Sequence, residues 1–167
     1  MTKLHLAGVV RESIVDGPGM RYTVFAQGCP HHCPGCHNAH TWPFSGGFEV
    51  EPEQIAAELR KNPMLRGITL SGGEPFCQCK AMAELAVLAH AAGYDVITYT
   101  GYLFEALLEQ AKTEPDVLSL LRETDVLIDG PFLQEQKSYD LRFRGSKNQR
   151  AIDAKASLSG IVMLAEL

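Results

Sequence analysis

The chain has 167 residues, which is enough for one compact domain and short for two, so we expect a single domain over residues 1–167. Hydrophobic residues make up 46% and charged residues 21% of the chain, which argues against disorder, and the net charge of −5 offers no basic field for nucleic acid. No apolar stretch is long enough for a signal peptide or a membrane span, so we expect a cytoplasmic protein without membrane or nucleic-acid partners.

Strand and helix patterns alternate along the chain. Residues 20–27 place Tyr22, Val24 and Ala26 on one face and predict the first strand. The stretch 28–50 is rich in Gly, Pro, His and Cys, and it predicts a long loop of functional character. The elements expected after it are a helix from Pro52 to Leu59, a strand over 67–71, a helix over 80–92, a strand over 94–99, a helix over 104–112, a strand over 124–129 and a late strand over 161–164.

This alternation is typical of β-α units with a mostly parallel sheet. The residues of chemical interest, Cys29, Gly72, Thr100 and Asp129, each follow a predicted strand. In parallel α/β folds ligands gather at the carboxyl ends of the strands. Four or five units are too few to close an eightfold barrel, so the sequence predicts an α/β fold with an open, partial (β/α) barrel.

Five cysteines lie in two tight groups, CPHHCPGC and CQC, all between Cys29 and Cys79. Such clustering in a reducing compartment indicates a metal or redox site rather than a disulfide scaffold. Cys29, Cys33 and Cys36 have the spacing C-x3-C-x2-C inside one loop. Iron–sulfur clusters ordinarily take four thiolates, so three would leave one iron open to an exogenous ligand.

Two other sites are compatible with these cysteines. Four histidines crowd the loop, and any of them could complete a closed Cys3His zinc site; they are His31, His32, His37 and His40. Alternatively, Cys77 or Cys79 could supply a fourth thiolate to a plain electron carrier of the ferredoxin type.

A second motif follows the strand at 67–71. Ser71-Gly72-Gly73-Glu74-Pro75 has glycines that allow close approach to the backbone, while Glu74 and backbone carbonyls can accept hydrogen bonds from an ammonium group. Alone, this motif would be a turn more often than a site. One strand after an open cluster motif, it indicates a ligand that carries an ammonium group.

These motifs together resemble a known superfamily. CPHHCPGC followed by SGGEP resembles the radical S-adenosylmethionine enzymes, and Asp16-Gly17-Pro18-Gly19 with Arg21 resembles the glycyl-radical-enzyme activases among them. Three later motifs resemble the branch that activates anaerobic ribonucleoside-triphosphate reductase: Thr100-Gly101-Tyr102, Leu127-Ile128-Asp129-Gly130 and Arg144-Gly145-Ser146-Lys147-Asn148-Gln149. The chain departs from the pattern at Gly35, where an aromatic residue is common, and at Pro131, where a lysine is common.

The resemblance implies a set of cofactor contacts. Cys29, Cys33 and Cys36 would bind three irons of a [4Fe–4S] cluster, and S-adenosylmethionine would chelate the fourth iron. The residues expected to bind S-adenosylmethionine are Ser71, Gly72, Gly73, Glu74 and Thr100 around its methionyl group and His37 and Asn38 near its adenosine. No shared motif includes Cys77 or Cys79.

The implied function is activation of a large partner. Reductive cleavage of S-adenosylmethionine would give a 5′-deoxyadenosyl radical, which would abstract hydrogen from a glycine of anaerobic ribonucleoside-triphosphate reductase. The electron donor would be a cytosolic protein such as flavodoxin or ferredoxin. Asp16, Arg21 and Asp129 are candidates for docking the partner, although Asp129 could instead only end its strand. The alternatives are activation of another glycyl-radical enzyme, of the pyruvate formate-lyase type, and a zinc-stabilised interaction module without catalysis.

Overall fold

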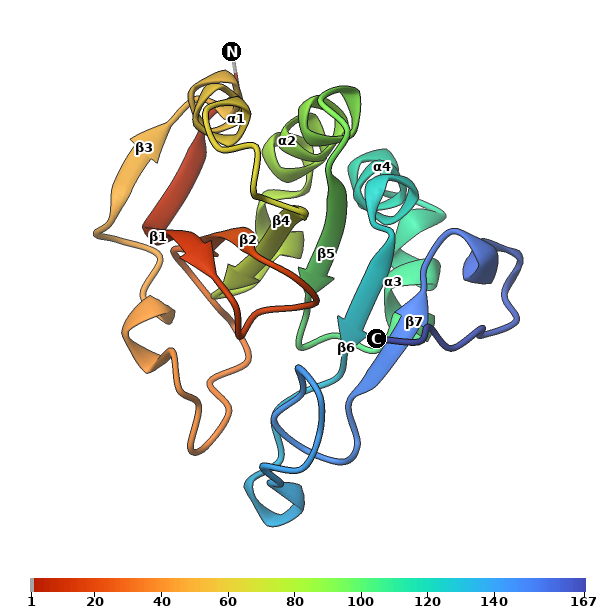
Figure 1. Cartoon of the computed structure of the whole chain (residues 1–167). Helices are drawn as coiled ribbons and strands as arrows, with labels where there is room; N and C mark the ends of the chain where they lie inside the picture. Colours follow the sequence, from red (N-terminus) through yellow and green to blue (C-terminus); the bar gives the residue numbers. More distant parts are fainter. Residues whose placement is uncertain (1) are drawn as a thin grey trace.

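The computed structural model describes residues 2–167 and contains a seven-stranded sheet in the order β3-β1-β2-β4-β5-β6-β7 (Figure 1). The strands are β1 (Leu4–Ser13), β2 (Arg21–Ala26), β3 (Phe48–Val50), β4 (Gly67–Gly72), β5 (Asp95–Tyr99), β6 (Val126–Asp129) and β7 (Arg150–Asp153). The α-helices are α1 (Pro52–Arg60), α2 (Cys79–Ala91), α3 (Phe104–Ala111) and α4 (Pro115–Glu123), and the 3₁₀ helices are η1 (Ala39–Thr41), η2 (Pro75–Gln78), η3 (Gln134–Gln136) and η4 (Ala156–Ser159). In this described part, no helix combines the length and hydrophobicity needed to cross a bilayer.

The centre of the sheet is parallel. β2, β4, β5 and β6 pair in parallel with one another, whereas β1, β3 and β7 pair antiparallel at the two edges. α2 connects β4 to β5, and α3 and α4 connect β5 to β6. The predicted α/β class with a mostly parallel sheet is therefore confirmed, with antiparallel strands added on both sides.

Most of the predicted elements lie where the sequence pattern puts them, but β1, β3, β7 and α4 were missed. The predicted late strand over 161–164 is wrong, because that stretch forms only an isolated bridge between Leu164 and Ile152. The true last strand is β7, which is only four residues long and follows a polar loop. α4 has a readable amphipathic pattern, since Val117, Leu120 and Leu121 are its buried residues.

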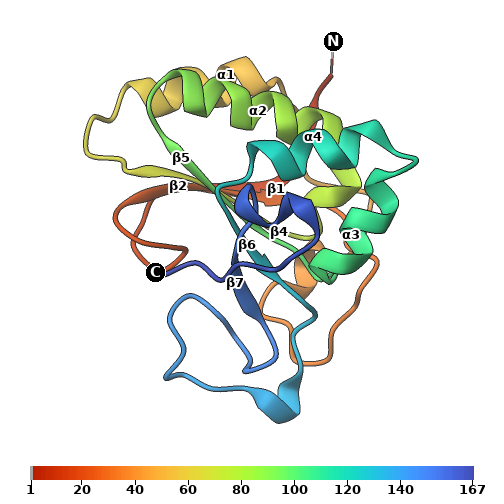
Figure 2. The ribbon, with the colours of Figure 1, turned by 90° about the vertical axis from the view of Figure 1, so that its right-hand side faces the viewer.

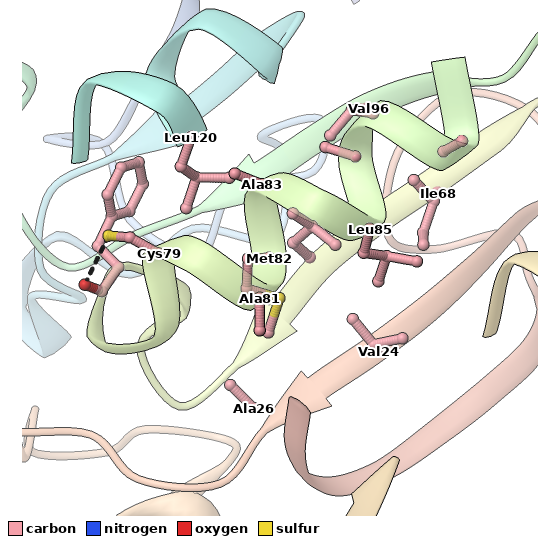
Figure 3. Close-up of a cluster of buried hydrophobic side chains, with 14 of the residues drawn as sticks. Val24, Ala26, Ile68, Cys79, Ala81, Met82, Ala83, Leu85, Val96 and Leu120 are labelled. Atoms are coloured by element: carbon pink, nitrogen blue, oxygen red, sulfur yellow. Dashed lines mark hydrogen bonds between the residues drawn. The ribbon is translucent and has the colours of Figure 1, made fainter. Parts of the chain in front are cut away.

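The helices cover one face of the sheet. Figures 1 and 2 show α1, α2 and α4 side by side over the strands, and Figure 3 shows α2 packed on them. Met82 and Leu85 of α2 are buried against the sheet residues Val24, Ile68 and Val96. This burial of apolar surface supplies the main stabilisation of the fold. The expected alternation in β2 is confirmed, because Tyr22, Val24 and Ala26 all belong to this core.

The opposite face of the sheet carries a buried cation. The side chain of Arg21 is 0% exposed, and its Nε donates to Thr69 Oγ1 at 2.8 Å. Its other nitrogens donate to the carbonyls of Ile68, at 2.9 Å, and Pro18, at 3.1 Å, and to the Asp95 carboxylate. Arg21 therefore ties the turn before β2 to β4 and β5.

We predict that Arg21→Met lowers the free energy of unfolding by about 3 kcal/mol, because it removes one partner of a buried, hydrogen-bonded charge pair. Arg66→Met is the matched control, since Arg66 also contacts Asp95 but is exposed, and its loss should cost less than about 1 kcal/mol. Anaerobic urea denaturation of both variants measures the difference. Equal losses in the two variants would contradict this account of Arg21.

Candidate functional site

Four of the predicted motifs lie at the carboxyl ends of the parallel strands, whereas Asp16-Gly17-Pro18-Gly19 precedes β2. The cysteine loop follows β2, the glycine pair ends β4, Thr100 follows β5, and Gly130 follows β6. Figure 1 shows the cysteine loop and the loop after β6 on the same side of the sheet. The neighbouring positions of these loops result from the parallel pairing of the four strands.

The cysteine loop is pinned at both ends. Gly28 N donates to the Thr41 carbonyl at 2.7 Å, and Cys29 N donates to the Trp42 carbonyl at 3.1 Å. The Thr41 hydroxyl in turn donates to the carbonyl of Asn38 at 2.6 Å. The arc that carries the three cysteines is therefore closed at its base by backbone hydrogen bonds.

The three cysteines differ in exposure. Cys29 is buried at the base of the loop, whereas Cys33 and Cys36 are partly exposed. Burial raises the pKa of the Cys29 thiol, against a lowering effect of backbone hydrogen bonds from His31 and His32. Cys36 N donates to the Cys33 carbonyl at 3.1 Å, and Asn38 N donates to Cys36 Sγ at 3.4 Å. The last contact is of the kind that stabilises a thiolate.

This loop fits an iron–sulfur cluster by the chemistry of its donors. It offers three thiols, the ligand type of such clusters, within one short arc. Within residues 2–167, no three Cys, His, Asp or Glu side chains are gathered closely enough to hold a metal ion. The stretch between the cysteines includes two residues with positive φ, His32 at 47° and Gly35 at 78°.

The histidines of the loop make other contacts. His31 Nε2 lies 2.6 Å from a carboxylate oxygen of Glu74, and its ring meets that of Tyr102 edge-on, with 4.5 Å between centroids. The His32 ring stacks on Trp42 with centroids 4.6 Å apart. In the described part of the chain, no histidine joins the cysteines in a Cys3His group.

The glycines after β4 bring two backbones together. Gly73 N donates to the Ala26 carbonyl at 2.8 Å, and Glu74 N donates to the Gly28 carbonyl at 2.9 Å. A Cβ on Gly73 would lie 2.3 Å from the oxygen of Gly28, and Gly72 has φ of +90°. The sequence suggested that these glycines admit a ligand. In the structure they first admit the start of the cysteine loop.

Glu74 joins the three loops. Its side chain is fully buried, and its carboxylate accepts hydrogen bonds from the Thr100 hydroxyl at 2.9 Å, Gly101 N at 2.8 Å and Phe76 N at 3.0 Å. With His31 as a further partner, the carboxylate links the cysteine loop, the end of β4 and the loop after β5. Glu74 is thus a clamp that positions these loops.

A cavity of about 610 Å³ opens beside the cysteine loop. Its wall includes five of the predicted site residues: Asp16, Cys36, His37, Asn38 and Ser71. The rest of the wall includes Tyr99 and residues of the loop between β6 and β7. Cys29, Cys33, Glu74 and Thr100 do not belong to the cavity wall.

The three docking candidates occupy different places. Asp16 lies on the cavity wall, where its Oδ2 accepts hydrogen bonds from Ser13 at 2.5 Å and Thr23 at 3.2 Å. Arg21 is buried below the turn, as described above. Asp129 is 0% exposed, and its carboxylate accepts from Phe104 N at 2.9 Å and pairs with Arg150. Arg21 and Asp129 are therefore too buried to contact a partner directly. Each could affect docking only by positioning the residues that it binds.

Cys77 and Cys79 lie away from this cavity. Partial burial and the nearby Glu74 carboxylate raise the pKa of Cys77 to about 11 and that of Cys79 to about 12. Cys79 Sγ donates to the Phe76 carbonyl at 2.9 Å (Figure 3). Both thiols are therefore protonated at neutral pH.

Part of the cavity wall was not predicted from the sequence. Tyr99, Phe132, Phe143 and Arg144 line it, although none had been selected as a cofactor-binding residue. Tyr99 was detectable in principle, because it alternates with the core residue Val96 and buried Thr98 along β5 and so faces the other side of the sheet. The remaining three depend on the path of an irregular loop, which no periodicity reveals.

Comparisons with known proteins identify the family. A family model described as a 4Fe-4S single cluster domain matches residues 15–152. A Salmonella typhi protein named anaerobic ribonucleoside-triphosphate reductase-activating protein is 40% identical over 144 residues, which cover 81% of this chain and 90% of the relative. Proteins of the same name are 37% identical in Vibrio cholerae, with 81% of this chain and 89% of the relative covered, and 34% identical in Enterobacteria phage T4, with 81% and 85% covered.

Among solved structures, QueE from Escherichia coli is similar with a TM-score of 0.45 and 19% identity, over 59% of this chain and 53% of that chain. The extent and identity of the sequence matches, rather than this structural likeness, decide the assignment. They confirm the resemblance that the cysteine, SGGEP and RGSKNQ motifs indicated. The chain belongs to the family of anaerobic ribonucleoside-triphosphate reductase-activating proteins and contains a 4Fe–4S single cluster domain.

Proposed function

We propose that this protein reductively cleaves S-adenosylmethionine at a [4Fe–4S] cluster and generates a glycyl radical on anaerobic ribonucleoside-triphosphate reductase. One observation supports it above the others: the loop with three thiols is tied through His31 to the buried Glu74 carboxylate, beside a cavity of about 610 Å³. A cluster site that lacks one protein ligand thus lies at the same edge of the sheet as Glu74, a carboxylate that can accept hydrogen bonds from an ammonium group.

Cys29, Cys33 and Cys36 would hold the cluster, and Glu74 would hold the ammonium of S-adenosylmethionine. Because the Glu74 carboxylate already accepts from Thr100, Gly101 and Phe76, the ammonium would have to replace His31 as a partner of this carboxylate. The glycine pair, Gly72 and Gly73, sets the backbone beside it. Ser71, His37 and Asn38 line the cavity and would contact the rest of the cofactor.

The chemistry that the bound cluster supplies is transfer of one electron to the sulfonium, which breaks a C–S bond and gives methionine and a 5′-deoxyadenosyl radical. The protein's own contribution is orientation and exclusion of competing hydrogen donors. The aromatic rings of Phe132 and Phe143 form part of the cavity wall, and the partly buried Tyr99 donates its hydroxyl hydrogen to the Phe143 carbonyl at 2.6 Å. One of the two tyrosine hydroxyls of the wall, that of Tyr99, is thereby engaged in a hydrogen bond, and the other belongs to Tyr139.

The partner's glycine would enter this cavity on an extended segment. Asp16 lies on the wall, and within the described residues its two hydrogen bonds both go to Oδ2, so that Oδ1 can accept from the segment's backbone. Arg21 supports the turn that carries Asp16. The electron would come from a cytosolic donor such as flavodoxin or ferredoxin, and residues 1–167 would act as a single domain in the cytoplasm.

The second candidate function is activation of pyruvate formate-lyase. The stretch Cys36-His37-Asn38, followed by Thr41-Trp42, also resembles the activase of that enzyme. The RGSKNQ motif and the names of the relatives favour the reductase. Reduced protein and S-adenosylmethionine are incubated anaerobically with each partner, and a glycyl signal is sought by electron paramagnetic resonance. We expect the signal with the reductase, and a signal with pyruvate formate-lyase alone would refute the choice.

We predict that Cys33→Ala abolishes both the iron–sulfur absorbance and the cleavage of S-adenosylmethionine, because two thiolates cannot hold the cluster. Cys77→Ala and Cys79→Ala are controls and should retain both, since these thiols lie after β4 and outside the loop that carries the three ligand cysteines. Iron and acid-labile sulfide are assayed in anaerobically purified protein. Loss of the cluster in either control would favour a ferredoxin-type carrier, and zinc without sulfide would favour the interaction module.

We predict that Glu74→Gln weakens S-adenosylmethionine binding by about 10- to 100-fold, the cost of losing a charged hydrogen-bond acceptor. The readout is the concentration of S-adenosylmethionine needed to change the electron paramagnetic resonance spectrum of the reduced cluster. Glu135→Gln, at an exposed position, serves as the control. Melting temperature and iron content are measured alongside, because the clamp also positions loops; unchanged affinity at normal iron content would contradict the assignment.

A further inference from the structure

The loop between β6 and β7 forms a basic cleft in an otherwise acidic protein. The cleft has a volume of about 380 Å³, and its charged lining residues are four cations, Arg142, Arg144, Lys147 and Arg150, and one acid, Asp140. The whole chain has a net charge of −5. The sign of the local charge is therefore opposite to that of the molecule.

Two of these four cations, Arg144 and Lys147, form no ion pair in the described part of the chain. Arg150 pairs with Asp129 and Glu105, but Arg142, Arg144 and Lys147 form no ion pair with Asp or Glu in the described part of the chain. Arg142 instead donates to the Leu167 oxygen at 2.5 Å. The Nε of Arg144 is buried and has no hydrogen-bond partner among residues 2–167. A buried donor without a partner carries a free-energy cost that a bound acceptor would remove.

The loop that carries the cations is held by its own polar residues. Gln149 Oε1 accepts from Gly145 N at 2.8 Å and from Ser146 N at 3.2 Å. The buried Ser146 hydroxyl donates to Asn148 Oδ1 at 2.6 Å, and Asn148 Nδ2 donates to the Pro131 carbonyl at 2.8 Å. The RGSKNQ motif is thus a braced turn that fixes the positions of the cations before any partner arrives.

The cleft adjoins the cavity of the candidate active site. Leu141, Arg144 and Gln149 line both hollows. In Figure 1 the loop lies at the same end of the sheet as the cysteine loop, below β6 and β7. A protein bound in the basic cleft would therefore lie next to the cavity.

We propose that this cleft binds an acidic segment of the partner reductase, so that carboxylates of the partner pair with Arg142, Arg144 and Lys147 while its glycine enters the cavity. The inference rests on the proposed function, because it names the recognition chemistry of that partner. Arginine forks match carboxylates in geometry. Charge complementarity of this kind accelerates association and fixes orientation.

The test is a double charge reversal, Arg142→Glu with Lys147→Glu, at exposed residues that line the cleft and not the cavity. Binding to the anaerobic ribonucleoside-triphosphate reductase encoded in the same genome is measured at about 0.05 M and about 0.3 M salt. We expect wild type to bind about tenfold or more weaker at high salt, and the variant to bind about tenfold or more weaker than wild type at low salt with a shallower salt dependence.

Lys80→Glu with Arg122→Glu is the matched control, since it makes the same charge change at exposed positions on the helix layer. This control should bind the reductase like wild type. Cleavage of S-adenosylmethionine without the reductase should stay within about twofold of wild type in both variants, because neither touches the cavity. The cleavage assay separates the two proposals. If the wild-type protein does not cleave S-adenosylmethionine, the proposed function is refuted, whatever the result of the binding measurement.

Three outcomes would overturn the assignment of the cleft. The first is equal loss of binding in the cleft variant and the helix-layer control, and the second is binding by wild type that does not change with salt. The third is tight salt-dependent binding of a duplex oligonucleotide that the cleft variant loses while it keeps its affinity for the reductase. Circular dichroism and melting temperature confirm that each variant is folded before binding is compared.

Discussion

The site depends on one buried carboxylate. Glu74 is fully buried, and a carboxylate in that position is stable only when hydrogen-bond donors surround it. The chain provides these donors from three separate stretches: the turn after β4, the loop after β5 and the cysteine loop. Removing the carboxylate would leave several buried donors unpaired, so the relative positions of the three loops are set by this group.

The two faces of the sheet have different tasks. The face under α1, α2 and α4 is apolar and supplies the hydrophobic core, with Leu85 and Ile68 among its fully buried members. The other face holds a buried guanidinium, hydroxyl groups and the cavity. Because successive side chains of a strand point to opposite faces, each parallel strand serves the core and the site at once.

Short motifs selected residues that the fold brings to one edge of the sheet, but they did not predict the contacts within the site. Cys29, Cys33 and Cys36 with Gly73 and Glu74 were selected from spacing and residue type alone, and the parallel strands bring their loops to one edge. What the sequence could not reveal is that Glu74 would be occupied by donors of its own chain, or that Gly73 is needed for contact with Gly28. Those contacts join residues far apart in sequence, and no local pattern encodes them.

The same reasoning explains the errors in the fold. β7 is a four-residue edge strand whose pairing with β6 depends on the path of the preceding loop, so its sequence carries little signal. The antiparallel pairing of β7 has a further meaning for the enzyme. It ends the run of parallel strands, and the sheet stays open between its two edge strands, β3 and β7. Under the proposed function, a large protein partner would cover this open side, and a radical formed there would be shielded from water only while that partner is bound.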